Sequence, residues 1–237
     1  MKSTVHNIYI KDNKIKKLVP LKANPLANSE VRVFLWQHTF DRAKLINFAE
    51  SYYPTTDFSQ YNTLRDKRFI EKLSILLLLH QILGSEVTIS YYATGRPYIK
   101  SYDDIKISIS HTTNTYAISF SVQPHGIDIE HYGETAFKVK RMYVNDAESK
   151  WLKQNITSEI EIYTQLWSAK EAIYKLYDQP GLSFKHDIIV KSPSSPSQYT
   201  AYISSLQKKC YVELYPYSKF ILTIAYDLTH EKKTELH

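Results

Sequence analysis

Cysteine is nearly absent from this chain, because Cys210 is the only one among its 237 residues. One thiol cannot build an internal disulfide framework, and no cysteine and histidine cluster has the spacing of a zinc site. Long hydrophobic runs are also lacking: the longest, from Leu73 to Leu79, is far shorter than the roughly 18 apolar residues that predict a membrane span. The segment from Met1 to Lys14 has no apolar core of a secretory signal. We therefore expect a soluble cytoplasmic protein with no membrane partner.

The charge balance limits the partners without identifying one. The chain has 30 basic and 24 acidic residues, a formal net charge of +6. Such a balance favours a polyanionic or acidic partner, and nucleic acid, a phosphorylated cofactor and an acidic protein surface are all compatible with it. A solvated basic face explains the same balance equally well. With 43% hydrophobic residues, the chain can bury the core of one large or two small domains.

The periodicity of apolar residues predicts a mixed α/β (α+β) protein. Helices are expected at residues 41–52 and 64–83, the second ending at Gly84, and strands at 5–10, 31–36, 87–92, 105–110, 115–122 and 126–130. The strands after residue 86 suggest an antiparallel meander. Two capping boxes, Asn145 with Glu148 and Ser158 with Glu161, predict two further helices, of which the second should end near Tyr177. We place the lobe boundary at residues 123 and 124, giving an N-terminal lobe (1–123) and a C-terminal lobe (124–237) that carries the metal site.

Two short segments combine carboxylates with lysines. In the first, GIDIE, Asp128 and Glu130 are two residues apart, so a strand would place both on one face. In the second, WSAKEAIYK, a helix would place Glu171 and Lys175 on one face, with Lys170 beside them. Carboxylate oxygens suit Mg²⁺, which proteins bind through one or two carboxylates and the phosphates of a substrate. Together the segments predict a metal site facing a phosphate site.

Each of these residues also has a simpler structural explanation. Glu171 and Lys175 could form a surface ion pair worth about 0.2–0.5 kcal/mol. Asp128 and Glu130 could be the solvated face of an edge strand, where charge opposes aggregation. For Trp167, packing in the core is the more common role. The two segments together favour the site over these explanations.

Four motifs in order carry a family resemblance: Gly95-Arg96-Pro97-Tyr98, Ile107-Ser108-Ile109-Ser110-His111, the GIDIE segment and the WSAKEAIYK segment. In this order and spacing, which extends over about half of the chain, the sequence resembles the 4'-phosphopantetheinyl transferases of the larger, surfactin-synthetase-activating (Sfp-like) type.

The resemblance implies a fold and a reaction. It implies two similar lobes in pseudo-twofold arrangement, each a small antiparallel sheet packed with helices, with coenzyme A between them. It also implies a Mg²⁺-dependent enzyme, with Mn²⁺ as an alternative metal. This enzyme transfers phosphopantetheine from coenzyme A to a serine of an apo acyl or peptidyl carrier protein with an acidic surface and releases 3',5'-ADP. Such carriers serve fatty-acid, polyketide or non-ribosomal peptide synthesis. We expect a monomer that does not bind nucleic acid.

The chemistry of this transfer assigns roles within the two segments. Asp128, Glu130 and Glu171 would bind the metal, while Lys175 and Lys170 would neutralise the phosphates. Glu171 and Lys175 are the candidate catalytic residues. Glu171 is the candidate base, acting on the serine hydroxyl directly or through a water on the metal.

The resemblance also assigns four residues to the phosphates of coenzyme A: Arg68, Arg96, Ser110 and His111. The family usually has lysine where Arg96 stands, and arginine can bind a phosphate with two hydrogen bonds. Lys67 competes with Arg68 for its position, and we favour Arg68. Two other classes of protein stay open as alternatives. One is another Mg²⁺-dependent phosphodiester or phosphoryl-transfer enzyme, such as a nuclease, and the other is a non-catalytic module that binds carrier proteins.

Overall fold

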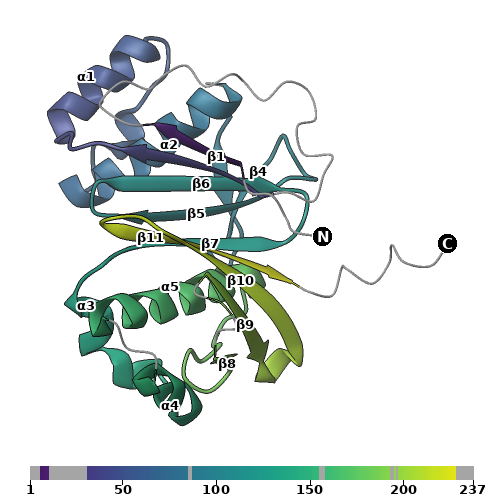
Figure 1. The fold of residues 1–237 in the computed structure, drawn as a ribbon. Coiled ribbons are helices and arrows are strands. Elements are labelled where there is room, and N and C mark those ends of the chain that lie inside the picture. Colours follow the sequence, from purple (N-terminus) through teal and green to yellow (C-terminus); the bar gives the residue numbers. More distant parts are fainter. Residues whose placement is uncertain are drawn as a thin grey trace. The chain divides into compact units, whose positions relative to one another are not determined.

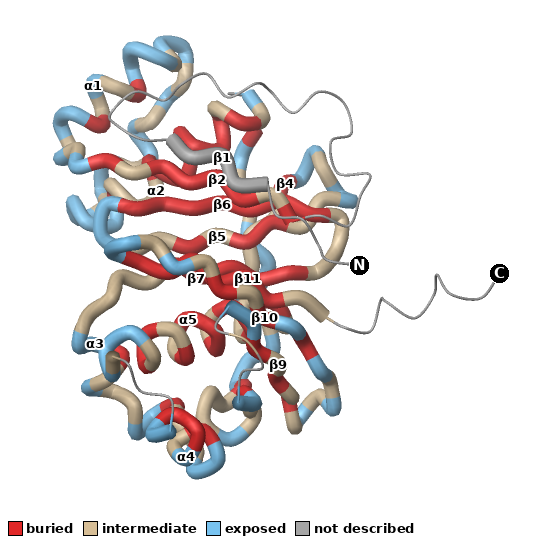
Figure 2. Tube along the Cα trace, viewed as in Figure 1, coloured by how far each residue is buried: buried red, intermediate tan, exposed pale blue. Residues whose placement is uncertain are grey.

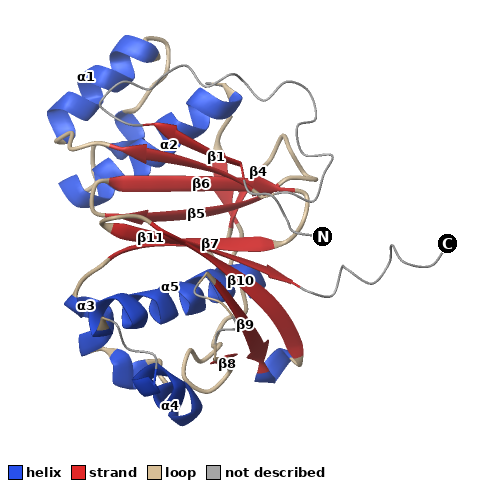
Figure 3. Ribbon diagram, viewed as in Figure 1, coloured by secondary structure: helices blue, strands red, loops and turns tan. Residues whose placement is uncertain are grey.

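The protein divides into two compact units, one ending at Gln123 and the other beginning at Pro124. The structure is a computed structural model that describes residues 6–10 (backbone only), 31–84, 87–154, 158–192, 195 and 197–227. Helices pack with mainly antiparallel sheets (Figures 1 and 3). The mixed α/β fold class that the sequence predicts is therefore confirmed. Each unit is described by itself below.

The N-terminal unit contains a four-stranded sheet in the order β1-β2-β6-β5. Its strands are β1 (His6–Ile10), β2 (Arg32–Gln37), β5 (Lys106–Thr112) and β6 (Thr115–Ser121), and a separate pair consists of β3 (Ile89–Tyr91) and β4 (Pro97–Ile99). Strand β1 runs parallel to β2, whereas the other neighbours are antiparallel. The expected antiparallel sheet is therefore present, with this one parallel pair added at its edge. A parallel pair needs a connection of about a dozen residues or more, which residues 11–31 can supply.

The described part of this unit also forms two α-helices and one short 3-10 helix: α1 (Arg42–Tyr52), η1 (Ser59–Tyr61) and α2 (Asp66–Leu83). Helix α1 begins where the side chain of Asp41 accepts a hydrogen bond from the backbone N–H of Lys44 at 2.9 Å. Helix α2 ends at Gly84, whose φ of 101° favours glycine. In the core, Leu73 and Leu77 of α2 belong to the same buried cluster as Phe34 and Phe120 of the sheet. Figure 2 shows that β2 and β6 are buried along most of their length. Among the described residues, no helix has both the length and the apolar composition needed to cross a membrane.

The C-terminal unit contains a five-stranded antiparallel sheet in the order β7-β11-β10-β9-β8. Its strands are β7 (His125–His131), β8 (Ile188–Val190), β9 (Gln198–Ile203), β10 (Lys208–Pro216) and β11 (Phe220–Asp227). Strand β7 pairs with β11 and belongs to a different sheet from β5 and β6, so the predicted meander is wrong at this point. Consecutive strands often pair, but this is a tendency that packing against other elements can override.

The helical elements of this unit are α3 (Glu134–Lys138), η2 (Lys140–Met142), α4 (Asp146–Gln154), α5 (Glu159–Tyr177) and η3 (Ser204–Leu206). Both predicted capping residues, Asn145 and Ser158, lie at the starts of the expected helices. The side chain of Ser158 accepts from the backbone N–H of Glu161, while Asn145 and Glu148 cap each other reciprocally. Helix α5 ends at Tyr177, as predicted.

Helix α5 packs directly on strand β7, and Gly126 makes this close approach possible. A Cβ atom at residue 126 would collide with the backbone of Ala172 and Leu176 in α5. Around this contact the unit has its own apolar core, in which Leu166 and Ile173 of α5 are buried in one cluster with Ile221 of β11. The glycine thus brings the helix against the face of β7 that carries the acidic residues.

Candidate functional site

Strand β7 presents Asp128 and Glu130 to helix α5. The two side chains follow Gly126 at intervals of two residues, which places all three on one face of the strand. Asp128 Oδ1 lies 2.8 Å from Lys175 Nζ, and the Asp128 side chain is only 5% exposed. Glu130 Oε1 accepts a hydrogen bond from Trp167 Nε1 at 3.0 Å. Both acids of the GIDIE segment therefore contact the helix that carries the other predicted residues.

Helix α5 contributes its side chains at a spacing of four residues. Trp167, Glu171 and Lys175 share one face because about 3.6 residues make a turn. The two outer residues contact Glu130 and Asp128, and Glu171 lies between them along the helix. The structure thus brings together four of the residues predicted for the metal and phosphate site.

Burial and like charge act on the carboxylates of this group. Desolvation, followed by the charge of Asp128, raises the pKa of Glu130 to about 7, against the opposing effects of the Trp167 hydrogen bond and of Lys175. The pKa of Glu171 is also raised, first by burial and then by the charge of Asp128, while Lys175 opposes the shift. The three acids are therefore close enough to repel one another in a partly dry environment.

This group matches a divalent cation in its chemistry. Three carboxylates offer the hard oxygen ligands that Mg²⁺ and Mn²⁺ prefer, and a cation would relieve their repulsion. The arrangement differs from a finished metal site: within the described ranges, no three carboxylate, imidazole or thiol side chains have metal-binding geometry. Instead, the ammonium of Lys175 contacts Asp128 and the indole of Trp167 contacts Glu130. Asp128, Glu130 and Glu171 fit a cation by kind and charge, whereas metal-binding geometry would need the ammonium of Lys175 to leave Asp128.

Lys170 lies elsewhere, and this corrects its assignment to the phosphates. Its ammonium is fully buried and donates to Glu148 Oε2 at 2.8 Å, to the carbonyl of Tyr143 at 2.7 Å and to the carbonyl of Phe184 at 2.7 Å. An ammonium has three hydrogens, so these three acceptors use its full capacity. Neighbouring residues on a helix point about 100° apart, which explains why Lys170 faces the interior while Glu171 faces β7.

In the N-terminal unit, Arg68 and His111 meet at a common acid. Arg68, in the first turn of α2, has Nη1 at 3.5 Å from Glu71 Oε2, and His111 Nε2 of β5 lies 3.8 Å from the same oxygen. The side chains of Arg68 and His111 are 59% and 34% exposed. Ser110 precedes His111 in β5 and is buried. The structure therefore brings together two of the four residues assigned to the coenzyme A phosphates and places a third next to one of them.

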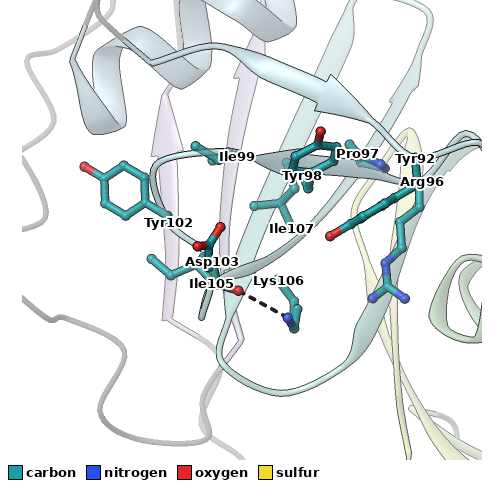
Figure 4. A pocket seen from close by; sticks show the side chains of 10 residues that line it. All are labelled: Tyr92, Arg96, Pro97, Tyr98, Ile99, Tyr102, Asp103, Ile105, Lys106 and Ile107. Atoms are coloured by element: carbon teal, nitrogen blue, oxygen red, sulfur yellow. Dashed lines mark hydrogen bonds between the residues drawn. The ribbon is translucent and has the colours of Figure 1, made fainter.

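Arg96 lines a pocket whose lining includes neither Arg68 nor His111. It follows Gly95, whose φ is 92°, in the turn between β3 and β4. The pocket is also lined by Lys106 and by the rings of Tyr92 and Tyr98, whose centroids are 4.4 Å apart (Figure 4). Arginine suits phosphate because its planar fork can bind one phosphate with two hydrogen bonds.

Three contributors were missed at the level of sequence. Trp167 was interpreted as a core residue, yet its indole N–H holds Glu130. Glu71 was not singled out, although its position three residues after Arg68 is a signal for an ion pair. Glu148 was recognised as a capping residue, and nothing in the sequence indicates that the same carboxylate also holds Lys170.

A comparison with curated proteins finds no match for this chain. A comparison with protein families gives one: residues 124–225 match the model of the 4'-phosphopantetheinyl transferase superfamily (ACPS). The matched region is somewhat less than half of the chain. It begins one residue before β7 and ends within β11, so it contains the carboxylates and lysines of the site. The match supports phosphopantetheine transfer in general.

Proposed function

We propose that this protein is a phosphopantetheinyl transferase of the larger, Sfp-like type. It transfers 4'-phosphopantetheine from coenzyme A to a serine of an apo acyl or peptidyl carrier protein and releases 3',5'-ADP. The observation that carries this proposal is the contact between β7 and α5, where Asp128 and Glu130 meet Lys175 and Trp167. This contact lies inside the region that matches the superfamily.

The reaction exchanges one bond to phosphorus for another. The serine oxygen forms a bond to the phosphorus that carries pantetheine, and the bond from this phosphorus to the bridging oxygen of the pyrophosphate breaks. The electron pair of that bond leaves with 3',5'-ADP. The serine must also lose its proton, and Glu171 is the proposed acceptor. Burial and Asp128 raise the pKa of Glu171, which makes it a stronger base than an ordinary carboxylate.

Negative charge grows on the phosphate oxygens and on the leaving group during this exchange. Lys175, whose side chain is 28% exposed, supplies positive charge there when its ammonium turns from Asp128 to the pyrophosphate. Asp128, Glu130 and Glu171 would hold Mg²⁺, or Mn²⁺ in its place, and the bound cation would neutralise further phosphate charge. Lys170 is omitted from this step because its hydrogens are already used.

The remaining assignments concern the rest of coenzyme A and the carrier. Arg68, Arg96, Ser110 and His111 are proposed to contact the phosphates of the cofactor, and the exposure of Arg68 and His111 supports this. The net charge of +6 suits an acidic carrier. A single cysteine, Cys210, suits a reducing compartment such as the cytoplasm.

The proposal is tested by incubating the protein with coenzyme A, MgCl₂ and a panel of apo carrier proteins, and measuring the mass of each carrier. We expect at least one carrier to gain the mass of one phosphopantetheine. The same carrier with alanine in place of its serine should gain nothing, and omission of Mg²⁺ should abolish the gain.

Two outcomes would contradict the proposal. One is the absence of a mass gain on every carrier, and the other is Mg²⁺-dependent cleavage of DNA or RNA by the same preparation. The second outcome would place the carboxylates in a phosphodiester enzyme of another class.

A further inference from the structure

The C-terminal unit buries a complete ion pair away from the proposed reaction. Lys170 and Glu148 are both 0% exposed, and their charged atoms are 2.8 Å apart. Beyond Lys170, Glu148 accepts from the backbone N–H of Val190 at 2.8 Å, and Lys170 donates to the carbonyls of Tyr143 and Phe184. The pair therefore ties α4, α5 and β8 to the segments that precede α4 and follow α5.

Such a pair is a poor way to stabilise a fold. Desolvating two charges costs several kcal/mol per ion, and well-packed apolar residues in their place are often about as stable or more stable. Burial lowers the pKa of Lys170 and raises that of Glu148, which shows the penalty on each charge. The pair instead fixes the geometry of the segments around it, because each hydrogen bond holds one atom in place relative to another.

The two carbonyls that Lys170 holds belong to aromatic residues in contact with Trp167. The ring of Tyr143 lies edge-on to the indole with centroids 5.0 Å apart, and the ring of Phe184 lies 5.5 Å away. We call Tyr143 and Phe184 the aromatic clamp. Lys170 is also three residues after Trp167 on α5, so it fixes the backbone of both clamp residues relative to the helix that carries the indole.

The clamped indole in turn holds Glu130. Its single donor, Nε1–H, reaches Glu130 Oε1 at 3.0 Å. Repulsion from Asp128 and Glu171 acts on the same carboxylate, so without the indole the side chain of Glu130 would be free to turn away. Residues that orient a metal ligand in this way typically change metal affinity by about 10- to 100-fold when they are removed.

We propose that the buried pair of Lys170 and Glu148 positions Glu130 through the aromatic clamp on Trp167. Lys170, Glu148 and Trp167 are positioning residues in this arrangement, and the pair contacts neither the metal nor coenzyme A. The effect on transfer rests on the proposed function, whereas the geometry itself does not.

The geometry is tested by hydrogen exchange of the indole N–H groups in protein labelled with ¹⁵N-tryptophan. The chain has three tryptophans, and Trp167→Phe identifies the signal of Trp167. In Lys170→Met and in Glu148→Gln, we expect the Trp167 N–H to exchange about tenfold faster, the equivalent of one lost hydrogen bond to a charged group. The signal of Trp36 serves as an internal reference. Unchanged exchange at Trp167 in both variants would overturn the proposal.

Single variants leave one buried charge without its partner and can fail to fold, so a neutral double variant is needed. Glu148→Leu with Lys170→Met removes both charges, and we expect it to recover the melting temperature of the wild type. If the pair positions the clamp, exchange at Trp167 stays fast in this double variant. If the pair is merely structural, exchange returns to the wild-type rate together with stability, and the proposal is wrong.

Binding of Mn²⁺, followed by calorimetry, measures the consequence at Glu130. We expect affinity about tenfold weaker in Lys170→Met and in Trp167→Phe, and no further loss when both are combined, because they act on one path. The matched control is Tyr143→Phe, which removes hydroxyl bonds to Ala136 and Tyr163 but keeps the ring and the carbonyl. It should lower stability without weakening Mn²⁺ binding. Additive losses would contradict a shared path.

The transfer assay separates this proposal from the proposed function. Lys170→Met should lower kcat and leave KM for coenzyme A within about twofold, because Lys170 does not touch the cofactor. A large rise in KM would show that it does, and would overturn the positioning role. If the wild type neither binds Mn²⁺ nor modifies any carrier, the proposed function fails, while the exchange rates still decide whether the pair positions Trp167.

Discussion

The two units hold their candidate residues in different ways. In the C-terminal unit the residues are buried or half-buried and held by partners from other elements: Asp128 is 5% exposed and bonded to Lys175, and Glu130 is bonded to Trp167. In the N-terminal unit, Arg68 is 59% exposed, and Glu71, with which it forms an ion pair, lies one turn away on the same helix. A reacting centre needs fixed geometry, whereas an exposed arginine can follow a flexible, charged ligand.

The two units also differ in the free-energy cost of burying their charged groups. Placing three carboxylates in partial burial raises the pKa of Glu130 and Glu171, which means that their charged forms are destabilised in the folded protein. Proteins accept such local instability at functional sites. Arg68 of the N-terminal unit, by contrast, is 59% exposed. Substitutions in the two units should therefore change activity and stability to different extents.

The largest expected effect is that of Glu171→Gln. Removing the proposed base should lower the rate of transfer about 10³-fold, as general bases typically contribute 10² to 10⁴. The melting temperature at pH 8 should be unchanged or higher, because an amide removes one charge from a repulsive group. The control is Glu161→Gln, an exposed glutamate in the first turn of the same helix, which should be neutral. Full activity in Glu171→Gln would remove this residue from the reaction.

The next largest effect is that of Gly126→Ala, which tests whether close packing of β7 on α5 builds the site. The added methyl group collides with backbone atoms of Ala172 and Leu176, so the helix must move away from the strand. We expect a loss of about 3 kcal/mol in the free energy of unfolding in urea, together with most of the activity.

Gly133→Ala is the matched control for this substitution. A Cβ atom there has its nearest neighbour, the carbonyl of His131, at 4.0 Å. The free energy of unfolding and the activity should therefore both stay close to those of the wild type. Equal effects of the two substitutions would show that the contact of β7 with α5 is unimportant.

A smaller effect is expected of pH on stability, through His38, a buried residue of the N-terminal unit that lies outside the candidate site. Desolvation lowers the pKa of His38 from 6.5 to about 4, and the ring bonds to Ser74 and stacks on Tyr116. Below pH 6.5, His38 binds a proton in the unfolded chain but stays neutral in the folded protein. Stability therefore falls as the pH drops toward 4. The loss should be about 2 kcal/mol between pH 7 and pH 5.

Urea unfolding at the two pH values measures this loss, and His38→Gln should remove most of it. If wild type and variant lose the same stability between pH 7 and pH 5, the acid sensitivity originates elsewhere.

The smallest expected effect concerns cofactor binding by the N-terminal unit. Arg68→Ala should raise KM for coenzyme A about tenfold and leave kcat nearly unchanged, because an exposed cation contributes to binding before and during reaction alike. The matched control is Lys67→Ala, an exposed cation beside it on the same helix. A larger effect of Lys67→Ala would reverse the choice between the two residues.

Local chemistry made much of this fold predictable. The capping box of Ser158 and Glu161 identifies the start of α5, and the Pro180-Gly181 pair explains why a helix stops near Tyr177. Alternation in the GIDIE segment correctly predicts a strand with both acids on one face. These features depend on residues close together in the sequence, so the sequence alone contains them.

Long-range packing explains what sequence reasoning missed. Strand β7 pairs with β11, the last strand of the unit, and no local signal selects that partner. Lys170 was assigned to phosphate because it stands beside Glu171. Neighbouring residues on a helix point to different sides, and on the side of Lys170 lies the buried Glu148 of α4. The Sfp-like subtype and the roles of the site residues stay predictions.

The most direct test of the central claim is to measure 3',5'-ADP and modified carrier in the same reaction. Transfer from coenzyme A predicts about one 3',5'-ADP for each carrier that gains phosphopantetheine, and neither product when Asp128→Asn replaces the wild type. Release of 3',5'-ADP without a modified carrier would mean hydrolysis of coenzyme A, and a modified carrier in equal yield with Asp128→Asn would contradict the site described for β7 and α5.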